Sequence, residues 1–597
     1  MRRALGLLMI GLLMSGGSYA QSAQEQQAYL QRFLMYLHWS QHLPSTDDPN
    51  FIHFIEKKSH LSTRLREQWL MQLARQHNWT LFNQYYRPSS NPSLPCERSL
   101  AHYEQSHDPE AWLPIKAQWL SGERLSPECE RIFTYYQQES LINEDLVHQR
   151  IENALKKNNI TLVKTLLTSH AKVHPQEHQL FLRIVRHEQA LQDLPRIPLQ
   201  GALYVFGLKQ LVPKHMDQAI VAWKKAPTQA LLTLAQKQDF LAYVSWYKAM
   251  RDEPDNALWF AHVLPAYYTD DLLDWQIRYA ILHEQWHKVL QLIEKSPQKE
   301  SPMWQYWSAR AYAALGQTLQ SRAIYEKLAK TRHYYGFLAA TRLHQALYID
   351  DSSHALQAAN LSAYAPILEH LRTLHATHHL SQASQRIDAF TSDLSPSEQY
   401  ALARWVAYEL NWPTKALELS QTGVLSEQLA LRFPLIYQHN IHRSAQQYHI
   451  PDAFLYAMIR QESGFHTDTY SFAGAYGLMQ LMPRTAQNIA RQMHLPWRGR
   501  QDLLRPDNNI TLGAAYLHQL ATTFHTHLIF MAAAYNAGPR QVHRWLHPLR
   551  THELDAWIET LPWVETRNYL KNIVSFYAVY QFRLNRGVEL GFMIERV

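Results

Sequence analysis

The stretch PDAFLYAMIRQESG, residues 451–464, decides the fold of the C-terminal part of the chain. Pro451 suits the first position of a helix, because its nitrogen has no hydrogen to donate and its φ is already helical. Leu455 and Met458 belong to an apolar stripe at helical spacing. Glu462 follows Met458 by four residues and therefore shares that face. The stretch predicts an amphipathic helix that carries a carboxyl group on its buried side.

Burial would change the chemistry of Glu462. Desolvation disfavours the charged form of a carboxyl group and raises its pKa, so the group keeps its proton near neutral pH. A general acid needs that condition. The alternative is a glutamate that caps the helix or forms a salt bridge in water. The helix alone leaves both interpretations open.

The residues after this helix favour a ligand-binding loop. Ser463 and Gly464 end the helix, and Ser471, Gly474 and Gly477 then form a tight loop in which small side chains let a ligand approach the backbone. Farther along, Gln480 offers an amide to a neutral polar ligand. The turn 534–539, Ala-Tyr-Asn-Ala-Gly-Pro, could present the Tyr535 hydroxyl and the Asn536 amide to a sugar.

The rest of the chain predicts helices almost throughout. It has 597 residues, too many for one core, with 46% hydrophobic and 18% charged residues. Only six of its 18 glycines lie in residues 21–440, and no run of alternating strands appears there. The segment 304–328 has two apolar helical patterns around Gly316, which resembles a tetratricopeptide-type repeat. We therefore expect an all-α protein with an N-terminal α-solenoid.

The N-terminus has the pattern of a secretion signal. Arg2 and Arg3 precede an apolar run over 4–14, and small residues at 18–20 form a cleavage site. No later stretch is long and apolar enough to predict a transmembrane helix. We expect a soluble protein outside the cytoplasm.

The two cysteines, Cys96 and Cys129, fit that compartment. In an oxidising environment they are expected to form a disulfide, and two separate buried thiols are the alternative. The net charge of +7 is spread along the chain without a lysine or arginine block, so nothing predicts nucleic-acid binding.

Four motifs together resemble one family. Glu462-Ser463, Gly-Leu-Met-Gln at 477–480, Ala-Tyr-Asn-Ala-Gly at 534–538 and Val-Glu-Thr-Arg-Asn-Tyr at 564–569 stand in the order and at spacings similar to those of the soluble lytic transglycosylases. The resemblance is strong over residues 445–585 and weaker over the signal, the cysteines and the helical N-terminal region. This layout is that of the family's large member, in which a helical superhelix forms a ring and carries a lysozyme-like domain.

The resemblance implies a fold, a domain order and a reaction. Residues 1–20 would be the signal peptide, 21–348 the α-solenoid, 349–440 a helical linker domain and 441–597 an α-helical domain similar to goose-type lysozyme. The substrate would be the glycan strand of peptidoglycan in the periplasm, cut between N-acetylmuramic acid and N-acetylglucosamine. The glutamate that matches Glu462 would act as acid and then as base, leaving a 1,6-anhydro end, without a metal or an organic cofactor.

The resemblance also implies the residues that line the substrate cleft. Tyr535 would lie nearest the chemistry, and Glu565 either lines the cleft or caps the helix that follows. Two positions depart from the family pattern: His466-Thr467 stand where Asn-Pro is frequent, and Phe472 stands where a small residue or proline is common. The expected substrate-binding residues are Ser471, Gln480, Met482, Tyr535, Asn536 and Glu565.

Three alternatives remain at this point. A muramidase would need the same acid but use water. A cell-wall-binding scaffold would use the solenoid without catalysis, and the retention of Glu462 argues against it. The segment 283–287 has the His-Glu-x-x-His pattern of zinc peptidases, but His283 to Gln285 is expected to form a turn, so the two histidines would not share a helix face. His375, His378 and His379 are likewise expected to be solvated, and no metal site is predicted.

Overall fold

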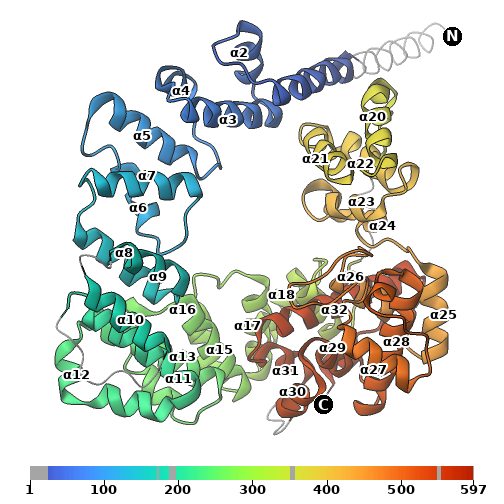
Figure 1. Ribbon diagram of the computed structural model, residues 1–597. Helices are drawn as coiled ribbons and strands as arrows, with labels where there is room; N and C mark the ends of the chain where they lie inside the picture. The colour runs from blue at the N-terminus through green and yellow to red at the C-terminus, as the bar shows by residue number, and fades with distance from the viewer. Residues whose placement is uncertain (1–23, 171–173, 187–196, 350–355, 547–552, 596–597) are drawn as a thin grey trace, which may run out of the picture. The chain divides into compact units, whose positions relative to one another are not determined.

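The computed structural model is helical throughout its described part (Figure 1). The described part contains two isolated β-bridges, Tyr470–Tyr476 and Tyr476–Leu481, and no β-strand. The predicted all-α class is therefore confirmed. The predicted signal segment, 1–20, lies outside the described residues. The structure describes residues 24–170, 174–186, 197–349, 356–546 and 553–595.

The chain divides into two compact units. Unit 1 joins Met1–Val244 to Ala359–Glu398, and unit 2 joins Ser245–Ala358 to Gln399–Val597. Parts of the segment 349–440 thus belong to each unit. The domain boundaries that the resemblance implies stay a prediction.

Unit 1 is a succession of short helices in which consecutive helices pack on each other. Polar caps start several of them: the side chains of Asp48, Ser59, Ser126 and Asn143 accept hydrogen bonds from free amides of the first helical turn. After a helix over 24–41 the elements are α2 (Pro49–Ile55), α3 (His60–Arg75), α4 (Trp79–Tyr85), α5 (Leu94–Ser106), α6 (Lys116–Trp119), α7 (Pro127–Gln138), α8 (Glu144–Lys156), α9 (Ile160–Ser169), α10 (Pro175–Arg186), α11 (Gln200–Lys224), α12 (Ala226–Leu231), most of α13 (Leu234–Met250), α20 (Ala365–Ala376) and α21 (Leu380–Thr391).

The two sequence segments of unit 1 are joined by hydrogen bonds. The Tyr29 hydroxyl donates to the Phe390 carbonyl oxygen at 2.7 Å. The carboxylate of Asp393 accepts from the amides of His60 at 2.9 Å and Leu61 at 3.2 Å, at the start of α3. Residues more than 300 positions apart in the sequence are thus in direct contact in unit 1.

The disulfide expected from the sequence is present. Cys96 on α5 and Cys129 on α7 are bonded, with their Cα atoms 5.3 Å apart. The alternative of two separate thiols is excluded. On the chain-entropy model, closing a loop of this length stabilises the fold by about 3–4 kcal/mol.

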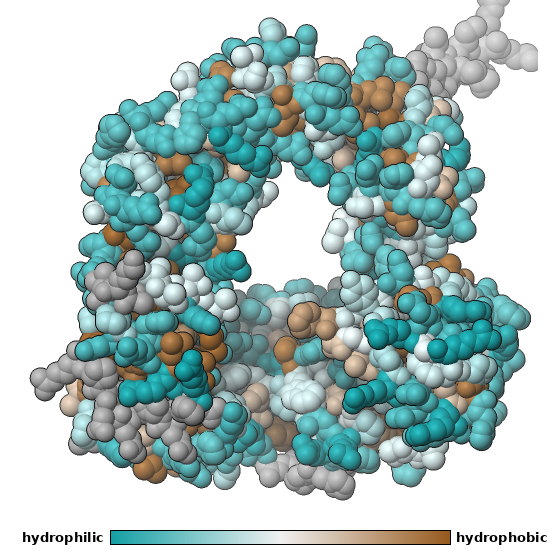
Figure 2. All heavy atoms as spheres, in the orientation of Figure 1, coloured by the Kyte–Doolittle hydropathy of each residue, from teal (hydrophilic) through white to brown (hydrophobic). Residues whose placement is uncertain are grey.

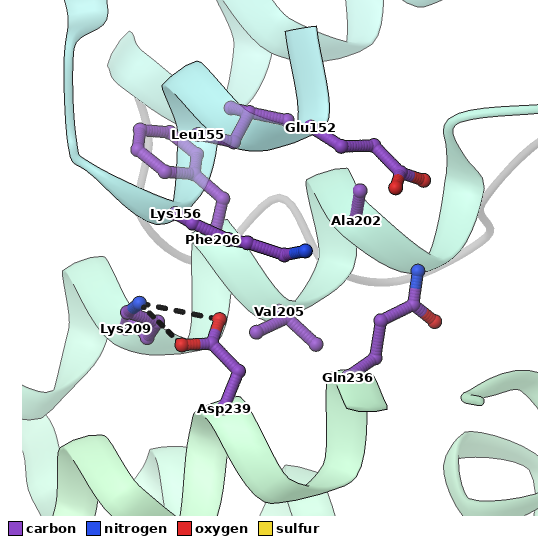
Figure 3. Close-up of a pocket in the computed structure, with 9 residues that line it drawn as sticks. All are labelled: Glu152, Leu155, Lys156, Ala202, Val205, Phe206, Lys209, Gln236 and Asp239. Atoms are coloured by element: carbon purple, nitrogen blue, oxygen red, sulfur yellow. Dashed lines mark hydrogen bonds and ion pairs between the residues drawn. The ribbon is translucent and has the colours of Figure 1, made fainter. Parts of the chain in front are cut away.

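Helices α8, α11 and α13 meet around a small pocket (Figure 3). Its volume is about 20 Å³, room for little more than a water molecule. Lys209 and Asp239 form an ion pair at 3.1 Å on one side of it. The pocket has mostly apolar walls with charged side chains at its rim, and it is too small for a substrate.

Unit 2 contains further helical hairpins and the C-terminal domain. The repeat-like segment 304–328 is confirmed as a hairpin: Gly316, with φ +76°, makes the turn between α17 and α18. The hairpin helices are α14 (Asn256–Phe260), α15 (Asp270–Leu282), α16 (Trp286–Lys295), α17 (Pro302–Ala314), α18 (Thr318–Leu328) and α19 (Tyr334–Arg342). After α22 (Pro396–Arg404), α23 (Pro413–Leu419) and α24 (Leu429–Arg432) come α25 (Gln438–Tyr448), α26 (Asp452–Glu462), α27 (Pro483–Gln492), α28 (Pro506–Thr523), α29 (Leu528–Ala537), α30 (Pro539–Leu546), α31 (Leu554–Thr560) and α32 (Val564–Arg583).

Buried ion pairs join the hairpins of unit 2 to its C-terminal domain. Glu559 on α31 lies 3.1 Å from Arg278 Nη2 on α15 and 2.8 Å from Lys571 Nζ on α32. Asp555, also on α31, pairs with Arg310 of α17 at 2.5 Å and Arg342 of α19 at 3.0 Å. Both carboxyl groups are 1% exposed, so each charge is compensated inside the protein.

The surface seen in Figure 2 is mostly hydrophilic, with apolar residues scattered over it. Among the described residues, no helix is long and apolar enough to cross a membrane.

Candidate active site

Helix α26 places Glu462 at the end of a buried segment. Every residue from 453 to 459 is buried, and Glu462, the last residue of the helix, is half-buried. Asp452 in the first turn pairs with Arg586 Nη2 at 2.5 Å, which fixes the start of the helix. The carboxyl group thus lies where core packing ends and solvent begins. The predicted helix and its buried face are confirmed.

Helix α32 supplies the partner of Glu462. The Tyr569 hydroxyl donates to Glu462 Oε1 at 2.6 Å and also lies 3.6 Å from Met458 Sδ. Tyr569 is 5% exposed, so this hydrogen bond is shielded from water. One carboxyl oxygen is therefore held in place by a buried phenol. Within the described residues Glu462 has no ion pair.

The surroundings of Glu462 favour its neutral form. Burial raises the pKa of Glu462 to about 7 against the hydrogen bond from Tyr569, which lowers it, and the negative charge of Glu565 raises it further. The position at the carboxyl end of α26 acts in the same direction, because that end of a helix is partially negative. A carboxyl group with this pKa is poised to give and to take a proton near neutral pH.

The loop after α26 is fixed by the backbone and by Ser463. Ser463 Oγ donates to the Leu478 carbonyl oxygen at 2.7 Å and so draws the segment 477–480 towards the end of the helix. Gly477 has φ +73°, and a Cβ there would overlap the Leu503 carbonyl oxygen. The fully buried Asn509 accepts from the Met479 amide at 2.8 Å. The glycine at 477 is thus required by a close backbone approach.

Tyr535 and Asn536 have different roles. The Tyr535 hydroxyl, on α29, donates to the Met479 carbonyl oxygen at 2.7 Å. Burial raises the pKa of Tyr535, and the charge of Glu462 adds to the shift, so the two side chains are electrostatic neighbours. Asn536 Oδ1 accepts a hydrogen bond from Thr566 Oγ1 at 2.7 Å, which ties α29 to the start of α32.

Ser471 and Gln480 form hydrogen bonds inside the loop. Ser471 Oγ accepts from the Ala475 amide at 3.0 Å. Gln480 has φ +45°, and its Nε2 donates to the Gly477 carbonyl oxygen at 2.9 Å. Both side chains stabilise the turn, a role that sequence reasoning did not assign to them.

Met482 and Glu565 are exposed. Met482 precedes α27 and is 43% exposed. Glu565 lies in the first turn of α32, where the helix dipole favours an acid. Within the described residues the N-cap residue of that helix, Trp563, makes no capping hydrogen bond with its side chain. Both roles considered for Glu565, lining the cleft and capping the helix, stay predictions. Two exposed aromatic residues, Tyr470 and Phe472, extend from the same loop as Ser471.

The zinc-peptidase pattern at 283–287 is not a metal site. Helix α15 ends at Leu282 and α16 begins at Trp286, with Glu284 at φ +52° in the turn between them. His283 Nε2 instead forms an ion pair with Asp252 at 2.5 Å. The predicted turn is confirmed, and the two histidines do not share a helix.

Sequence comparisons relate this part of the chain, and most of its length, to murein transglycosylases. A model of the transglycosylase SLT domain matches residues 439–558. The soluble lytic murein transglycosylase of Escherichia coli K12 is 26% identical over 538 residues, which cover 87% of this chain and 82% of that protein. A putative soluble lytic murein transglycosylase of Haemophilus influenzae is 33% identical over 328 residues, 53% of each chain.

Solved structures agree over the whole chain. The lytic transglycosylase Slt of Pseudomonas aeruginosa, solved as an inactive Glu→Gln mutant, has a TM-score of 0.75 and 26% identity, covering 100% of this chain and 99% of that chain. The 70 kDa soluble lytic transglycosylase of Escherichia coli has a TM-score of 0.69 and 22% identity, covering 99% and 98%. The predicted α-solenoid followed by a lysozyme-like domain is confirmed. By its fold, its domain match and its relatives, the chain contains a transglycosylase SLT domain and is similar over most of its length to soluble lytic murein transglycosylases.

Proposed function

We propose that the protein is a peptidoglycan lytic transglycosylase that cleaves the β-1,4 bond between N-acetylmuramic acid and N-acetylglucosamine. The observation that carries the proposal is the state of Glu462. Its pKa is raised to about 7, so a large fraction of the carboxyl groups hold a proton at neutral pH. The Pseudomonas relative solved as an inactive Glu→Gln mutant supports a reaction that depends on one glutamate.

In the proposed reaction Glu462 acts twice. It first donates its proton to the glycosidic oxygen, the bond from that oxygen to C1 of the muramic residue breaks, and the N-acetylglucosamine part leaves with a new hydroxyl. The carboxylate then accepts the proton of the C6 hydroxyl of the same muramic residue, whose oxygen bonds to C1. The product has a 1,6-anhydro end, Glu462 is protonated again, and no water is consumed.

Tyr569 is proposed to orient the carboxyl group. Its hydroxyl occupies Glu462 Oε1 at 2.6 Å and leaves Oε2 for the substrate. A group that must both give and receive a proton at nearby oxygens needs a fixed plane, and a buried phenol provides it without adding a charge. Tyr569 acts through Glu462 and is therefore a positioning residue.

The substrate-binding residues are proposed to act in two ways. Met482, Glu565, Tyr535 and Asn536 would contact the sugars with side-chain atoms. Ser471 and Gln480, whose side chains bond within the loop, would act mainly by shaping it, so that backbone groups around Gly474 and Gly477 face the glycan.

Product analysis tests the reaction type. We expect purified sacculi digested with the protein to release muropeptides with 1,6-anhydro ends, each lighter by one water molecule than the hydrolytic product. A muramidase is the second candidate, because the exposed Glu565 acts electrostatically on Glu462 and could orient a water molecule. Reducing ends alone would favour the muramidase. No release at all from a folded protein would favour a scaffold.

We also propose a periplasmic location and a reaction without cofactor. The location rests on the signal-like residues 1–20 and on the cell-wall substrate of the relatives. Because a single glutamate suffices for both proton transfers, we expect activity to be unchanged after treatment with a chelator. Loss of activity that added metal restores would contradict this.

A further inference from the structure

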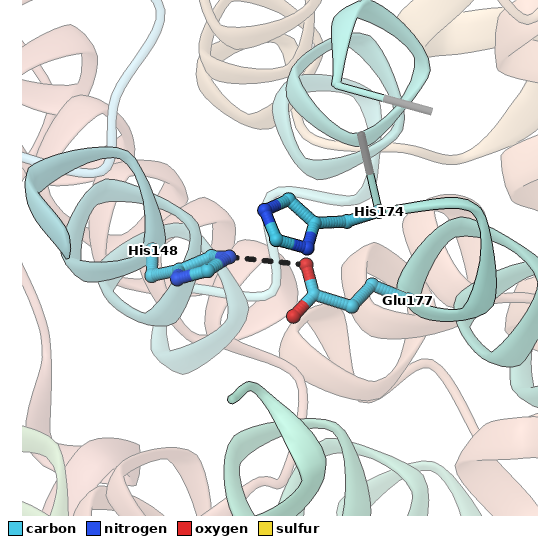
Figure 4. A group of neighbouring side chains, drawn as sticks. All are labelled: His148, His174 and Glu177. Carbon is cyan, nitrogen blue, oxygen red and sulfur yellow. Dashed lines mark hydrogen bonds and ion pairs between the residues drawn. The ribbon is translucent and has the colours of Figure 1, made fainter. Parts of the chain in front are cut away.

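Unit 1 brings together three side chains that suit a metal ion (Figure 4). His148 lies on α8, His174 directly precedes α10, and Glu177 lies in the first turn of α10. Their ligand atoms all lie within 4.8 Å of one another. The group belongs to the solenoid, whereas Glu462 belongs to unit 2.

The distances describe a cluster of two helix ends. His148 Nε2 is 3.1 Å from Glu177 Oε2, and His174 Nε2 is 3.3 Å from Glu144 Oε2. Glu144 and His148 are four residues apart on α8, so they share a helix face. His174 and Glu177 are three residues apart across the start of α10. Each of the two segments thus contributes one carboxylate and one imidazole.

Burial makes this arrangement costly without a further partner. Glu177 is 1% exposed, and within the described residues its Oε1 has no hydrogen-bond partner. His174 Nε2 is also buried and makes no hydrogen bond there, although Glu144 is near. A buried acceptor without a partner costs about 1–3 kcal/mol, and more when it is charged. A cation between these atoms would remove that cost.

A simple ion pair accounts for only part of the cluster. His148 Nε2 can donate a hydrogen bond to Glu177 Oε2, which lies 3.1 Å away. Within the described residues that pair leaves Glu177 Oε1 and His174 Nε2 without a hydrogen bond, and His174 Nε2 has only the ion-pair contact with Glu144. A metal ion could bind both atoms, because the ligand atoms of the three side chains lie within 4.8 Å of one another and imidazole nitrogen and carboxylate oxygen are metal ligands.

We propose that His148, His174 and Glu177 bind one divalent transition-metal ion, with Glu144 as the fourth ligand. Zn²⁺ suits this set, because it prefers imidazole nitrogen and carboxylate oxygen in tetrahedral geometry. With metal–ligand bonds of about 2.1 Å, tetrahedral ligands lie roughly 3.4 Å apart. The separations of 3.1 Å between His148 and Glu177 and 3.3 Å between His174 and Glu144 are close to that spacing. The ion would tie α8 to α10 and stabilise this part of the solenoid.

Zinc titration of the whole chain tests the site. The probe is ZnCl₂ added to tag-free, chelator-stripped protein, with the bound metal counted after desalting. We expect about one tightly bound ion per chain and a rise in melting temperature on adding zinc. We expect His148→Gln and Glu177→Gln to weaken zinc binding by roughly tenfold or more, since each removes a ligand. Co²⁺ in place of Zn²⁺ should give the visible spectrum of a tetrahedral nitrogen–oxygen site.

Matched variants separate this site from the other histidines of the chain, 34 in all. His178→Gln, on α10 but outside the cluster, should bind zinc as the unchanged protein does. If Glu177→Gln fails to fold, His174→Gln decides, because that side chain is 22% exposed and its loss leaves no large cavity. Absence of a stoichiometric zinc ion in the unchanged protein would overturn the proposal. So would His148→Gln and His174→Gln variants that bind zinc with the affinity of the unchanged protein.

Discussion

Unit 2 contains two glutamates with opposite electrostatics, the half-buried Glu462 and the buried Glu559. Glu559 lies 2.8 Å from Lys571 Nζ and 3.1 Å from Arg278 Nη2. Burial alone would raise its pKa, but the two cations outweigh burial and hold the pKa well below the usual range. Glu462 has a phenol as its partner, and burial raises its pKa to about 7. A cation beside a buried carboxyl fixes its charge, and a neutral partner leaves it able to exchange a proton.

One helix serves both glutamates. Tyr569 and Lys571 are two residues apart on α32, so they point to different sides of it. Tyr569 bonds Glu462, and Lys571 bonds Glu559 and, at 2.7 Å, the Tyr335 hydroxyl. The ion pair with Glu559 anchors α32 to α31 and thereby holds Tyr569 in position. The ion pair of Glu559 and Lys571 is therefore structural, and it helps to position the hydrogen bond between Tyr569 and Glu462.

Replacing Glu462 by glutamine is expected to have the largest effect. The amide keeps the shape but cannot transfer a proton, and general acid–base catalysis contributes about 10²–10⁴-fold in rate. We expect Glu462→Gln to lose at least that much activity on purified sacculi while retaining the helical circular dichroism of the unchanged protein. The Glu559→Gln variant provides the contrast: its activity, measured on the folded fraction, should fall much less than that of Glu462→Gln. A Glu462→Gln variant that kept its activity would show that Glu462 is not the catalytic acid.

Replacing Glu559 by glutamine is expected to affect stability most. Among the described residues, the substitution leaves Lys571 without its carboxylate and Arg278 with only Asp274, at 3.4 Å. Removing one member of a buried ion pair typically costs about 3–5 kcal/mol. The free energy of unfolding from chemical denaturation measures it. The matched control is Glu326→Gln, which removes an exposed pair with Arg322 at 2.8 Å and should cost about 0–1 kcal/mol. Equal losses in the two variants would show that the buried cluster is not special.

Glu462→Gln is expected to stabilise the protein at alkaline pH. The pKa of Glu462 is raised from 4.5 to about 7 in the folded state, so ionising it there costs free energy that the unfolded chain does not bear. The neutral amide avoids that cost, and we expect a gain of about 1–3 kcal/mol above pH 7. The gain should fall as the pH drops from about 7 to 4.5 and vanish below, where both states are protonated.

Chemical denaturation at several pH values measures this gain. Glu326→Gln is the control, because that side chain is an exposed member of a surface ion pair on α18 and its loss should cost about 0–1 kcal/mol. A gain of the same size at acid and alkaline pH would mean that packing, and not ionisation, causes it.

The smallest expected effect concerns Tyr569. Because protonated Glu462 starts the reaction, kcat/KM should fall as the pH rises through about 7. The Tyr569 hydrogen bond lowers the pKa of Glu462, so Tyr569→Phe should raise it and move this alkaline limb upward by up to about one pH unit. Tyr580→Phe, on the same helix, should leave the limb unchanged. A shift of the limb to lower pH would contradict the role given to Tyr569.

Local pattern was sufficient for part of this account. Residue spacing over a few positions predicts four of the observed features: the helix that ends at Glu462, its buried face, the hairpin around Gly316 and the turn at His283. The disulfide followed from the count of two cysteines and the expected compartment. The helix and turn predictions depend on residues within one or two helical turns of each other. The disulfide prediction depends on there being two cysteines that can pair.

The partners of the glutamates could not be read from local pattern. Tyr569 is 107 residues from Glu462, and Arg278 is 281 residues from Glu559. The motif at 564–569 drew attention to Glu565, but nothing in it distinguishes the buried tyrosine. Ser471 and Gln480 were expected to face the ligand, and the loop uses their side chains for its own hydrogen bonds. His148 on α8 and His174 before α10 likewise come together only in the folded chain.

The most direct test of the central comparison is the titration of Glu462 itself. The carboxyl band in the infrared difference spectrum between the unchanged protein and Glu462→Gln reports its protonation as a function of pH. We expect a protonated carboxyl at about pH 6 that is lost with a midpoint near 7, while the corresponding Glu559→Gln difference shows a carboxylate throughout. A midpoint near 4.5 for Glu462, or an ionised group at about pH 6, would contradict the account.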